Sequence, residues 1–135
     1  MSGRSIHEFG DRQGSARRVK HAPGALDSWE KVAARLGNRK AALVEGQLVA
    51  VFEDWINGCR FHAGWAEPEG NLADGARFFA IKRIPIRAYF WYSKSSRNTI
   101  VVSHYVNKTW RKLRPEDTSR VKANWEREQE GDLNK

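Results

Sequence analysis

The sequence RFFAIKRIPIRAYFWYSKSSRNTIVVSHY, at residues 77–105, predicts three consecutive strands joined by tight turns. Apolar and polar side chains alternate through residues 77–83 and again through residues 86–92. A polar tip at residues 93–98 predicts a second hairpin turn, and a β-branched run follows at residues 99–105. We therefore expect an antiparallel meander at the centre of the protein.

The alternation divides the second strand between two faces of the sheet. One face is apolar and is expected to be buried, and it carries Ile86, Ala88 and Phe90. The opposite face carries Arg87, Tyr89 and Trp91, and Lys82 of the preceding strand falls on the same side. Cations and aromatic rings therefore share one face.

Positive charge is concentrated in this part of the chain. Residues 77–114 contain ten Lys and Arg and no Asp or Glu, and the whole protein has a net charge of +8. A basic block on predicted strands favours a polyanionic partner.

Two helices are expected before the strands, and a short strand at residues 17–21 before the helices. Asp27 resembles an N-cap with Glu30 three positions on, and Gly37 ends that helix. An apolar stripe at helical spacing predicts a second helix over residues 38–57. The alternative for this segment is a hairpin that turns at Gly46-Gln47.

The remaining segments complete an α+β domain at residues 17–130. Turn-forming residues predict a loop at residues 58–76, and Pro115 begins a C-terminal helix that Gly131 ends. We expect a disordered basic tail at residues 1–16 and a frayed end at residues 131–135. The fold class is a small antiparallel sheet, mixed through the N-terminal strand, packed against two N-terminal helices with a C-terminal helix.

The composition points to a soluble cytoplasmic protein that needs no cofactor. Cys59 has no partner for a disulfide, and the chain lacks a secretory signal and a long apolar segment. The four histidines are scattered, so no metal site is expected.

The strongest functional feature is the combined basic and aromatic stripe, together with the segment at residues 104–113 that follows the last strand. Cations neutralise phosphates and aromatic rings stack on unpaired bases, which favours single-stranded RNA over duplex DNA. The alternative is a solvated face on which the last helix covers Tyr89 and Trp91.

His104 is the one histidine within the basic block. Its ordinary pKa near 6.5 suits general acid or base catalysis. The alternative is a hydrogen-bonded structural histidine at the end of a strand.

Three local segments resemble the RelE-like toxins of toxin–antitoxin systems, in their HigB-like and phage-derived branch. Ile86-Arg87-Ala88-Tyr89-Phe90 is similar to the central strand of that family. His104-Tyr105-Val106-Asn107-Lys108 resembles its His-Gly-Phe-x-Lys-Lys segment, although Tyr105 and Asn107 depart from that pattern. Lys112 with Pro115 and Glu116 resembles the entry to its last helix, so the likeness runs from Arg17 to Glu130.

The resemblance implies a ribosome-associated mRNA endonuclease that uses no metal and leaves a 2′,3′-cyclic phosphate. It implies phosphate stabilisation by Arg87 and Lys82, phosphate binding or proton transfer by Lys108, and acid or base catalysis by His104. Other contacts with RNA would come from Arg83, Tyr89, Trp91, Trp110, Arg111 and Lys112.

The implied partners are mRNA on the ribosome and a cognate antitoxin, with a helix-turn-helix protein as the expected type. No membrane partner is expected. Two alternatives remain open at this point: a non-catalytic RNA- or DNA-binding protein, and a toxin on the same fold that acts on gyrase.

Overall fold

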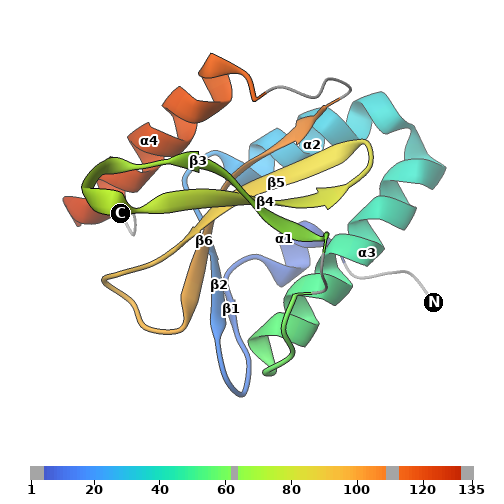
Figure 1. Cartoon of the computed structure of the whole chain (residues 1–135). Helices are drawn as coiled ribbons and strands as arrows, with labels where there is room; N and C mark the ends of the chain where they lie inside the picture. Colours follow the sequence, from blue (N-terminus) through green and yellow to red (C-terminus); the bar gives the residue numbers. More distant parts are fainter. Residues whose placement is uncertain (1–4, 62–63, 109–112, 132–135) are drawn as a thin grey trace.

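The computed structural model describes residues 5–61, 64–108 and 113–131. It is an α+β structure in which a six-stranded mixed sheet, ordered β1-β2-β6-β5-β4-β3, is accompanied by four helices (Figure 1). The fold class expected from the sequence is confirmed. Among the described residues, no helix is both long and apolar enough to cross a bilayer.

The central meander forms as expected from the alternation. Strands β4 (Arg77–Arg83) and β5 (Ile86–Tyr92) have the predicted bounds, and β6 (Thr99–Asn107) continues two residues beyond the predicted end. Both neighbouring pairs are antiparallel. Strand β2 (Arg18–His21) runs parallel to β6, which makes the sheet mixed as predicted.

The expectation of a loop at residues 58–76 was wrong. Strand β3 (Ala66–Asn71) pairs antiparallel with β4 and forms the edge of the sheet, and a short 3-10 turn (Ala73–Gly75) follows it. An edge strand tolerates Pro68 because one side of its backbone needs no ladder partner. Gly70 is required by close packing, since a Cβ there would lie 2.5 Å from the Phe78 ring.

The prediction of a disordered tail at residues 1–16 was also wrong for the part that the structure describes. Helix α1 (Ile6–Phe9) and strand β1 (Arg12–Gln13) belong to the fold, and β1 pairs with β2. Ile6 and Phe9 are buried, and the ring of Phe9 stacks on Phe52 at 5.6 Å. Two apolar anchors and the pairing with β2 therefore hold a segment of otherwise polar composition.

Helices α2 (Ala25–Leu36) and α3 (Asn38–Ile56) follow one another directly, so the hairpin alternative at Gly46 is excluded. Helix α2 begins three residues earlier than the sequence pattern suggested. Its N-cap is Gly24, with a φ of 85°, and Asp27 lies in the first turn. Carboxylates in the first turn favour a helix through its dipole without acting as the cap.

Helices cover both faces of the sheet. Trp29 of α2 and Phe52 of α3 pack with Ile81 and Phe90 in one core. Helix α4 (Pro115–Gln129) has the predicted start at Pro115 and lies on the other face, where its Val121 packs in a second core. The two cores match the two faces that the alternation predicts.

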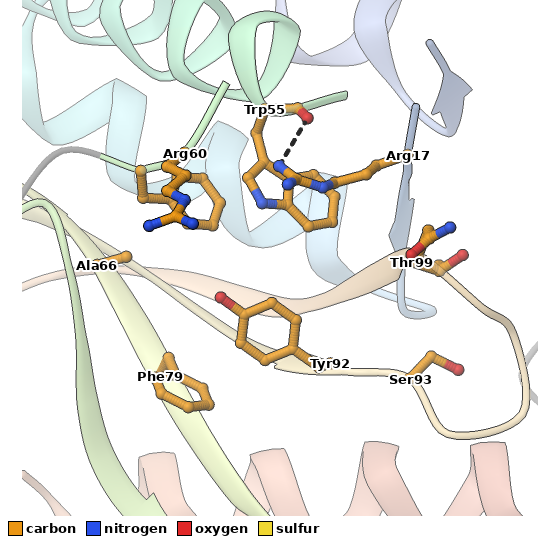
Figure 2. Close-up of a pocket in the computed structure, with 10 residues that line it drawn as sticks. Arg17, Trp55, Arg60, Ala66, Phe79, Tyr92, Ser93 and Thr99 are labelled. Carbon is orange, nitrogen blue, oxygen red and sulfur yellow. Dashed lines mark hydrogen bonds between the residues drawn. The ribbon is translucent and has the colours of Figure 1, made fainter. Parts of the chain in front are cut away.

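Helix α3 does not pack against the whole length of the sheet face that it covers. A pocket of about 510 Å³ lies between the end of α3 and the end of the sheet where β5 turns into β6 (Figure 2). Its lining includes Trp55, Phe79 and Tyr92.

We expect Phe9→Leu to lower the free energy of unfolding by about 1–2 kcal/mol, because a buried ring that stacks on another ring is replaced by a smaller side chain. Urea denaturation of the two proteins measures this difference. Glu8→Gln, on the exposed side of the same segment, is the matched control and should change stability by less than about 0.5 kcal/mol. Equal stability of Phe9→Leu and the wild type would mean that the segment does not dock on the core.

Candidate functional site

Three of the four residues assigned to catalysis meet beside the turn between β4 and β5. The strand register places Lys82 opposite Arg87, and Arg87 opposite Val106 of β6. Lys108 follows β6 directly, and its backbone amide donates to the carbonyl of Pro85 at 2.7 Å. The three cations therefore lie at one end of the α4 face.

Two carboxylates that sequence reasoning missed complete this cluster. Lys82 Nζ lies 3.0 Å from Glu67 Oε2 and 3.8 Å from Glu69 Oε1. Arg87 Nη1 forms an ion pair with Glu69 Oε1. Residues 77–114 contain no acidic residue, but the folded sheet places Glu67 and Glu69 of the edge strand β3 beside their cations.

Glu69 reaches the cluster because of an irregularity in β3. The register between β3 and β4 shifts between Pro68 and Gly70, which leaves Glu69 as the extra residue of a bulge. Bulges re-aim the side chain that they contain. The signal in the sequence was the pair of acids two residues apart, but the surrounding Pro and Gly obscured a strand.

The cluster is partly shielded and still accessible. The exposed fractions of the side chains are 26% for Lys82, 18% for Arg87 and 13% for Glu69, whereas Lys108 is 7% exposed and forms the buried side of the cluster. Charges in such a partly dry position interact more strongly than on an open surface. When Lys108 and Arg114 are counted with Lys82 and Arg87 against Glu67, Glu69 and Asp117, four cations lie near three carboxylates, so a phosphate would still meet an excess of positive charge.

The pKa of Lys108 is lowered from its ordinary value by burial, and the positive charge of Arg87 lowers it further. A lysine with a lowered pKa gives up a proton more readily near neutral pH than an ordinary lysine. Lys108 is thus suited to donate a proton to a leaving oxygen.

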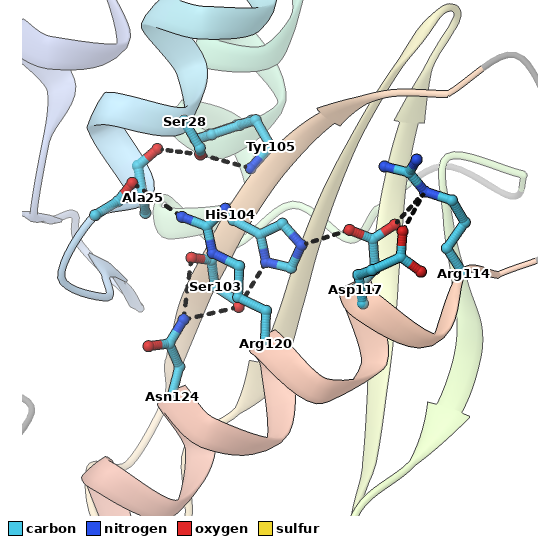
Figure 3. A network of polar contacts seen from close by, with 11 residues as sticks. Ala25, Ser28, Ser103, His104, Tyr105, Arg114, Asp117, Arg120 and Asn124 are labelled. Carbon is cyan, nitrogen blue, oxygen red and sulfur yellow. Dashed lines mark hydrogen bonds and ion pairs between the residues drawn. The ribbon is translucent and has the colours of Figure 1, made fainter.

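His104, the fourth residue assigned to catalysis, has a structural place. Its side chain is fully buried beneath α4, with Nε2 3.1 Å from Asp117 Oδ1 and Nδ1 2.8 Å from Ser103 Oγ (Figure 3). Burial lowers the pKa of His104, which favours the neutral ring. The expectation that His104 acts as an accessible acid or base was wrong, and the structural alternative is confirmed.

The hydrogen bonds around His104 form one consistent chain. Asn124 Nδ2 donates to Ser103 Oγ at 3.0 Å, the Ser103 hydroxyl can donate to His104 Nδ1, and His104 Nε2 can donate to Asp117. The negative charge of Asp117 contributes to the pKa of Lys108. His104 therefore holds Asp117 in place beneath α4.

The aromatic part of the expected RNA surface is not available. Tyr89 and Trp91 are 0% and 1% exposed, and Trp91 Nε1 donates to Glu128 Oε1 of α4 at 2.8 Å. Their assignment as stacking residues was wrong, and the alternative in which the last helix covers them is confirmed. The α4 helix carries Val121 and Trp125 onto this face, so the rings are core.

The remaining predicted contacts are either on the other face or outside the described residues. Arg83 Nε donates to Gln47 Oε1 of α3 at 2.6 Å, and its guanidinium lies over the Trp65 ring. Arg83 is therefore separated from Lys82 by the sheet, as strict alternation requires. Trp110, Arg111 and Lys112 lie outside the described residues.

Within the described ranges there is no group of three His, Cys, Asp or Glu side chains arranged to hold a metal ion. No protein-family model, curated protein or solved structure matches this chain. The candidate site is therefore the cluster formed by Lys82, Arg87, Lys108, Glu67 and Glu69, here called the Glu69 cluster.

Proposed function

We propose that this protein is the toxin of a toxin–antitoxin system and cleaves mRNA on the ribosome. The observation that carries the proposal is the Glu69 cluster, in which a carboxylate lies between two cations with a third cation of lowered pKa beside them. Cleavage of RNA at a phosphodiester needs a base, an acid and positive charge around the phosphate. The cluster supplies all three.

The proposed reaction uses the 2′-hydroxyl of the RNA as the nucleophile. Glu69 accepts the proton from the 2′-oxygen, which attacks the adjacent phosphorus and forms the new O2′–P bond. The P–O5′ bond breaks, and Lys108 donates a proton to the leaving 5′-oxygen. The products are a 2′,3′-cyclic phosphate and a free 5′-hydroxyl, without oxidation or reduction of any group.

Arg87 and Lys82 would bind the phosphoryl oxygens as negative charge develops on them. In the resting protein both cations are paired with glutamates, which keeps them in place on the strands. A phosphate that enters the cluster would displace part of these ion pairs and leave Glu69 unpaired. Glu69 would then be free to accept the proton of the 2′-hydroxyl.

Expression in bacteria tests the proposal. Induction should stop growth within a few generations, and primer extension on ribosome-bound mRNA should reveal new 5′ ends. Purified protein added to translating ribosomes should release fragments that end in a 2′,3′-cyclic phosphate. Intact mRNA in arrested cells whose DNA replication has stopped would instead indicate a gyrase-directed toxin.

A non-catalytic RNA-binding protein is the second candidate, and the ion pairs of Lys82 and Arg87 favour it. Cations that remain paired with glutamates can still contact a phosphate backbone, but they leave no free base. This candidate predicts salt-dependent RNA binding by the wild type with no cleavage product at any time.

A toxin requires an antitoxin, and a small helix-turn-helix protein is the expected partner. The Glu69 cluster is the surface that an acidic segment of such a protein would cover. Coexpression with the neighbouring reading frame should restore growth, and the two proteins should copurify.

A further inference from the structure

The pocket on the α3 face has aromatic walls. Trp55, Phe61, Phe79 and Tyr92 contribute rings to a hollow of about 510 Å³ (Figure 2). Trp55 and Phe61 are stacked at 5.5 Å, and Tyr92 meets Phe79 edge to face at 5.2 Å. The volume lies within the range of sites for small ligands.

The Tyr92 ring is the accessible part of these walls. Tyr92 is 48% exposed, whereas Trp55 is 5% exposed. Among the described Phe, Tyr and Trp side chains, Tyr92 alone is exposed, whereas the others are buried or half-buried. A planar ligand could stack on the open side of Tyr92 without disturbing the core.

The two charged side chains among the described lining residues of this pocket are both positive. Arg17 and Arg60 line it, and Arg77 lies over the Phe79 ring at 5.6 Å. None of the described lining residues is acidic. This arrangement differs from the Glu69 cluster, where each of two cations faces a glutamate.

Arg17 is held in position by backbone carbonyls and an aromatic ring, and among the described residues no ion pair joins it to a carboxylate. Its Nη1 donates to the carbonyls of Trp55 at 3.2 Å and Cys59 at 3.0 Å, and its guanidinium lies 4.9 Å above the Trp55 ring. Carbonyl acceptors fix the guanidinium but leave its charge for an anion. Little conformational entropy would then be lost when an anion binds.

We infer that this pocket binds one unpaired nucleotide, with its base stacked on Tyr92 and its phosphate held by Arg17 and Arg60. A planar aromatic group joined to a phosphate matches both the rings and the cations. The nucleotide can be free or part of a single-stranded RNA, since the recognised chemistry is the same.

This site is separate from the Glu69 cluster and does not depend on cleavage. Tyr92 and Arg87 are on opposite faces of β5 and five residues apart, which corresponds to roughly 17 Å along the strand. Loss of cleavage would therefore leave nucleotide binding intact. A nucleotide bound here would anchor RNA at a distance from the reacting phosphate.

Fluorescence anisotropy with a dye-labelled 2′-O-methyl RNA tetranucleotide measures binding without cleavage. Tyr92→Leu should weaken binding about tenfold through loss of stacking, and Arg60→Gln should weaken it several-fold. Tyr92→Phe keeps the ring and should bind like the wild type. Arg35→Gln, an exposed arginine in the last turn of α2, is the matched charge control and should also bind like the wild type.

Competition with adenosine monophosphate, ribose 5-phosphate and inorganic phosphate separates the possible ligands. Adenosine monophosphate should displace the tetranucleotide better than ribose 5-phosphate does, and equal competition by these two would overturn the inference. If adenosine monophosphate binds as tightly as the tetranucleotide, the ligand of the pocket is a free nucleotide. If the tetranucleotide binds much more tightly, the ligand is single-stranded RNA. Both results support the site.

Chemical shifts of the ¹⁵N-labelled protein locate the bound nucleotide even where a variant folds poorly. Adenosine monophosphate should shift the amides of Arg60 and Tyr92. Shifts confined to Lys82 and Arg87 would place the ligand in the Glu69 cluster and refute the pocket. Displacement of the tetranucleotide by an acidic, aromatic peptide at lower concentration than by nucleotide would assign the pocket to a protein partner instead.

Discussion

Arg87→Gln should reduce the rate of RNA cleavage by at least about 100-fold, the usual cost of removing one preorganised charge from a transition state. Arg87 lies on a rigid central strand, and its guanidinium is held by Glu69 in the resting protein. Glutamine is polar but shorter than arginine and carries no charge, so the phosphoryl oxygens would lose the positive charge that faces them. Initial rates of cleavage of ribosome-bound mRNA measure this effect.

Arg83→Gln is the matched control for this experiment. Arg83 is on the neighbouring strand of the same hairpin, but it contacts Gln47 and Trp65 on the α3 face. The change removes the same charge from the protein, and the cleavage rate should stay within about twofold of the wild type. An Arg87→Gln protein that melts normally and cleaves like the wild type would exclude the Glu69 cluster as the active site.

Glu69→Gln separates base catalysis from charge. The variant keeps the shape of the side chain and makes the cluster more positive, so RNA binding should tighten while cleavage falls. If the protein only binds RNA, Arg87→Gln weakens binding and Glu69→Gln strengthens it, with no cleavage to lose. The two variants together therefore distinguish a nuclease from a binding protein.

Acid should destabilise this protein through a buried histidine, by about 3 kcal/mol between pH 6.5 and 4. His21 lies beneath the first core with its ring 2% exposed, and burial lowers its pKa to about 4. In the unfolded chain its pKa is the ordinary value near 6.5. Below that pH the unfolded chain binds a proton that the native protein does not, so the free energy of unfolding falls.

The contacts of His21 explain why the neutral ring is retained. Nδ1 lies 3.0 Å from the carbonyl of Gly10, and Nε2 lies 2.7 Å from the Tyr105 hydroxyl. The neutral ring satisfies both partners by donating at Nδ1 and accepting at Nε2. A protonated ring would have no lone pair for the Tyr105 hydroxyl. His104 contributes in the same direction, because burial also lowers its pKa.

Urea denaturation between pH 7 and pH 4.5 measures the dependence. His21→Gln should be less stable at pH 7 but should lose less stability on acidification, since its buried group no longer titrates. His7→Gln removes an exposed histidine that pairs with Glu30 and contributes only a minor part of the lowered pKa of His21, so it should change the pH dependence far less than His21→Gln does. Parallel stability curves for His21→Gln and the wild type would show that His21 is not the origin of the acid sensitivity.

The amino-acid sequence was sufficient for the elements whose pattern is local and strong. Alternation defined β4 and β5 to the residue, and an apolar stripe defined α3 despite Gly46. Pro115 marked the first turn of α4. These elements follow from the geometry of neighbouring residues on a strand or a helix, which is present in any short window of sequence. The sequence analysis did not predict the edge strand β3 or the ordered N-terminal segment, because both are ordered by pairing and docking with distant residues.

The candidate site also combines features that the local sequence predicts with features that only tertiary contacts decide. Residue type and alternation were enough to place Lys82 and Arg87 on one face, because that property belongs to a single hairpin. Whether a side chain on that face meets solvent depends on what packs over it, and α4 covers Tyr89, Trp91 and His104 while leaving Arg87 partly open. The ion pair between Glu69 and Arg87 joins strands 18 residues apart in the chain. Such contacts exist only once the sheet has formed, since burial and charge pairing are set by distances through space and not along the chain.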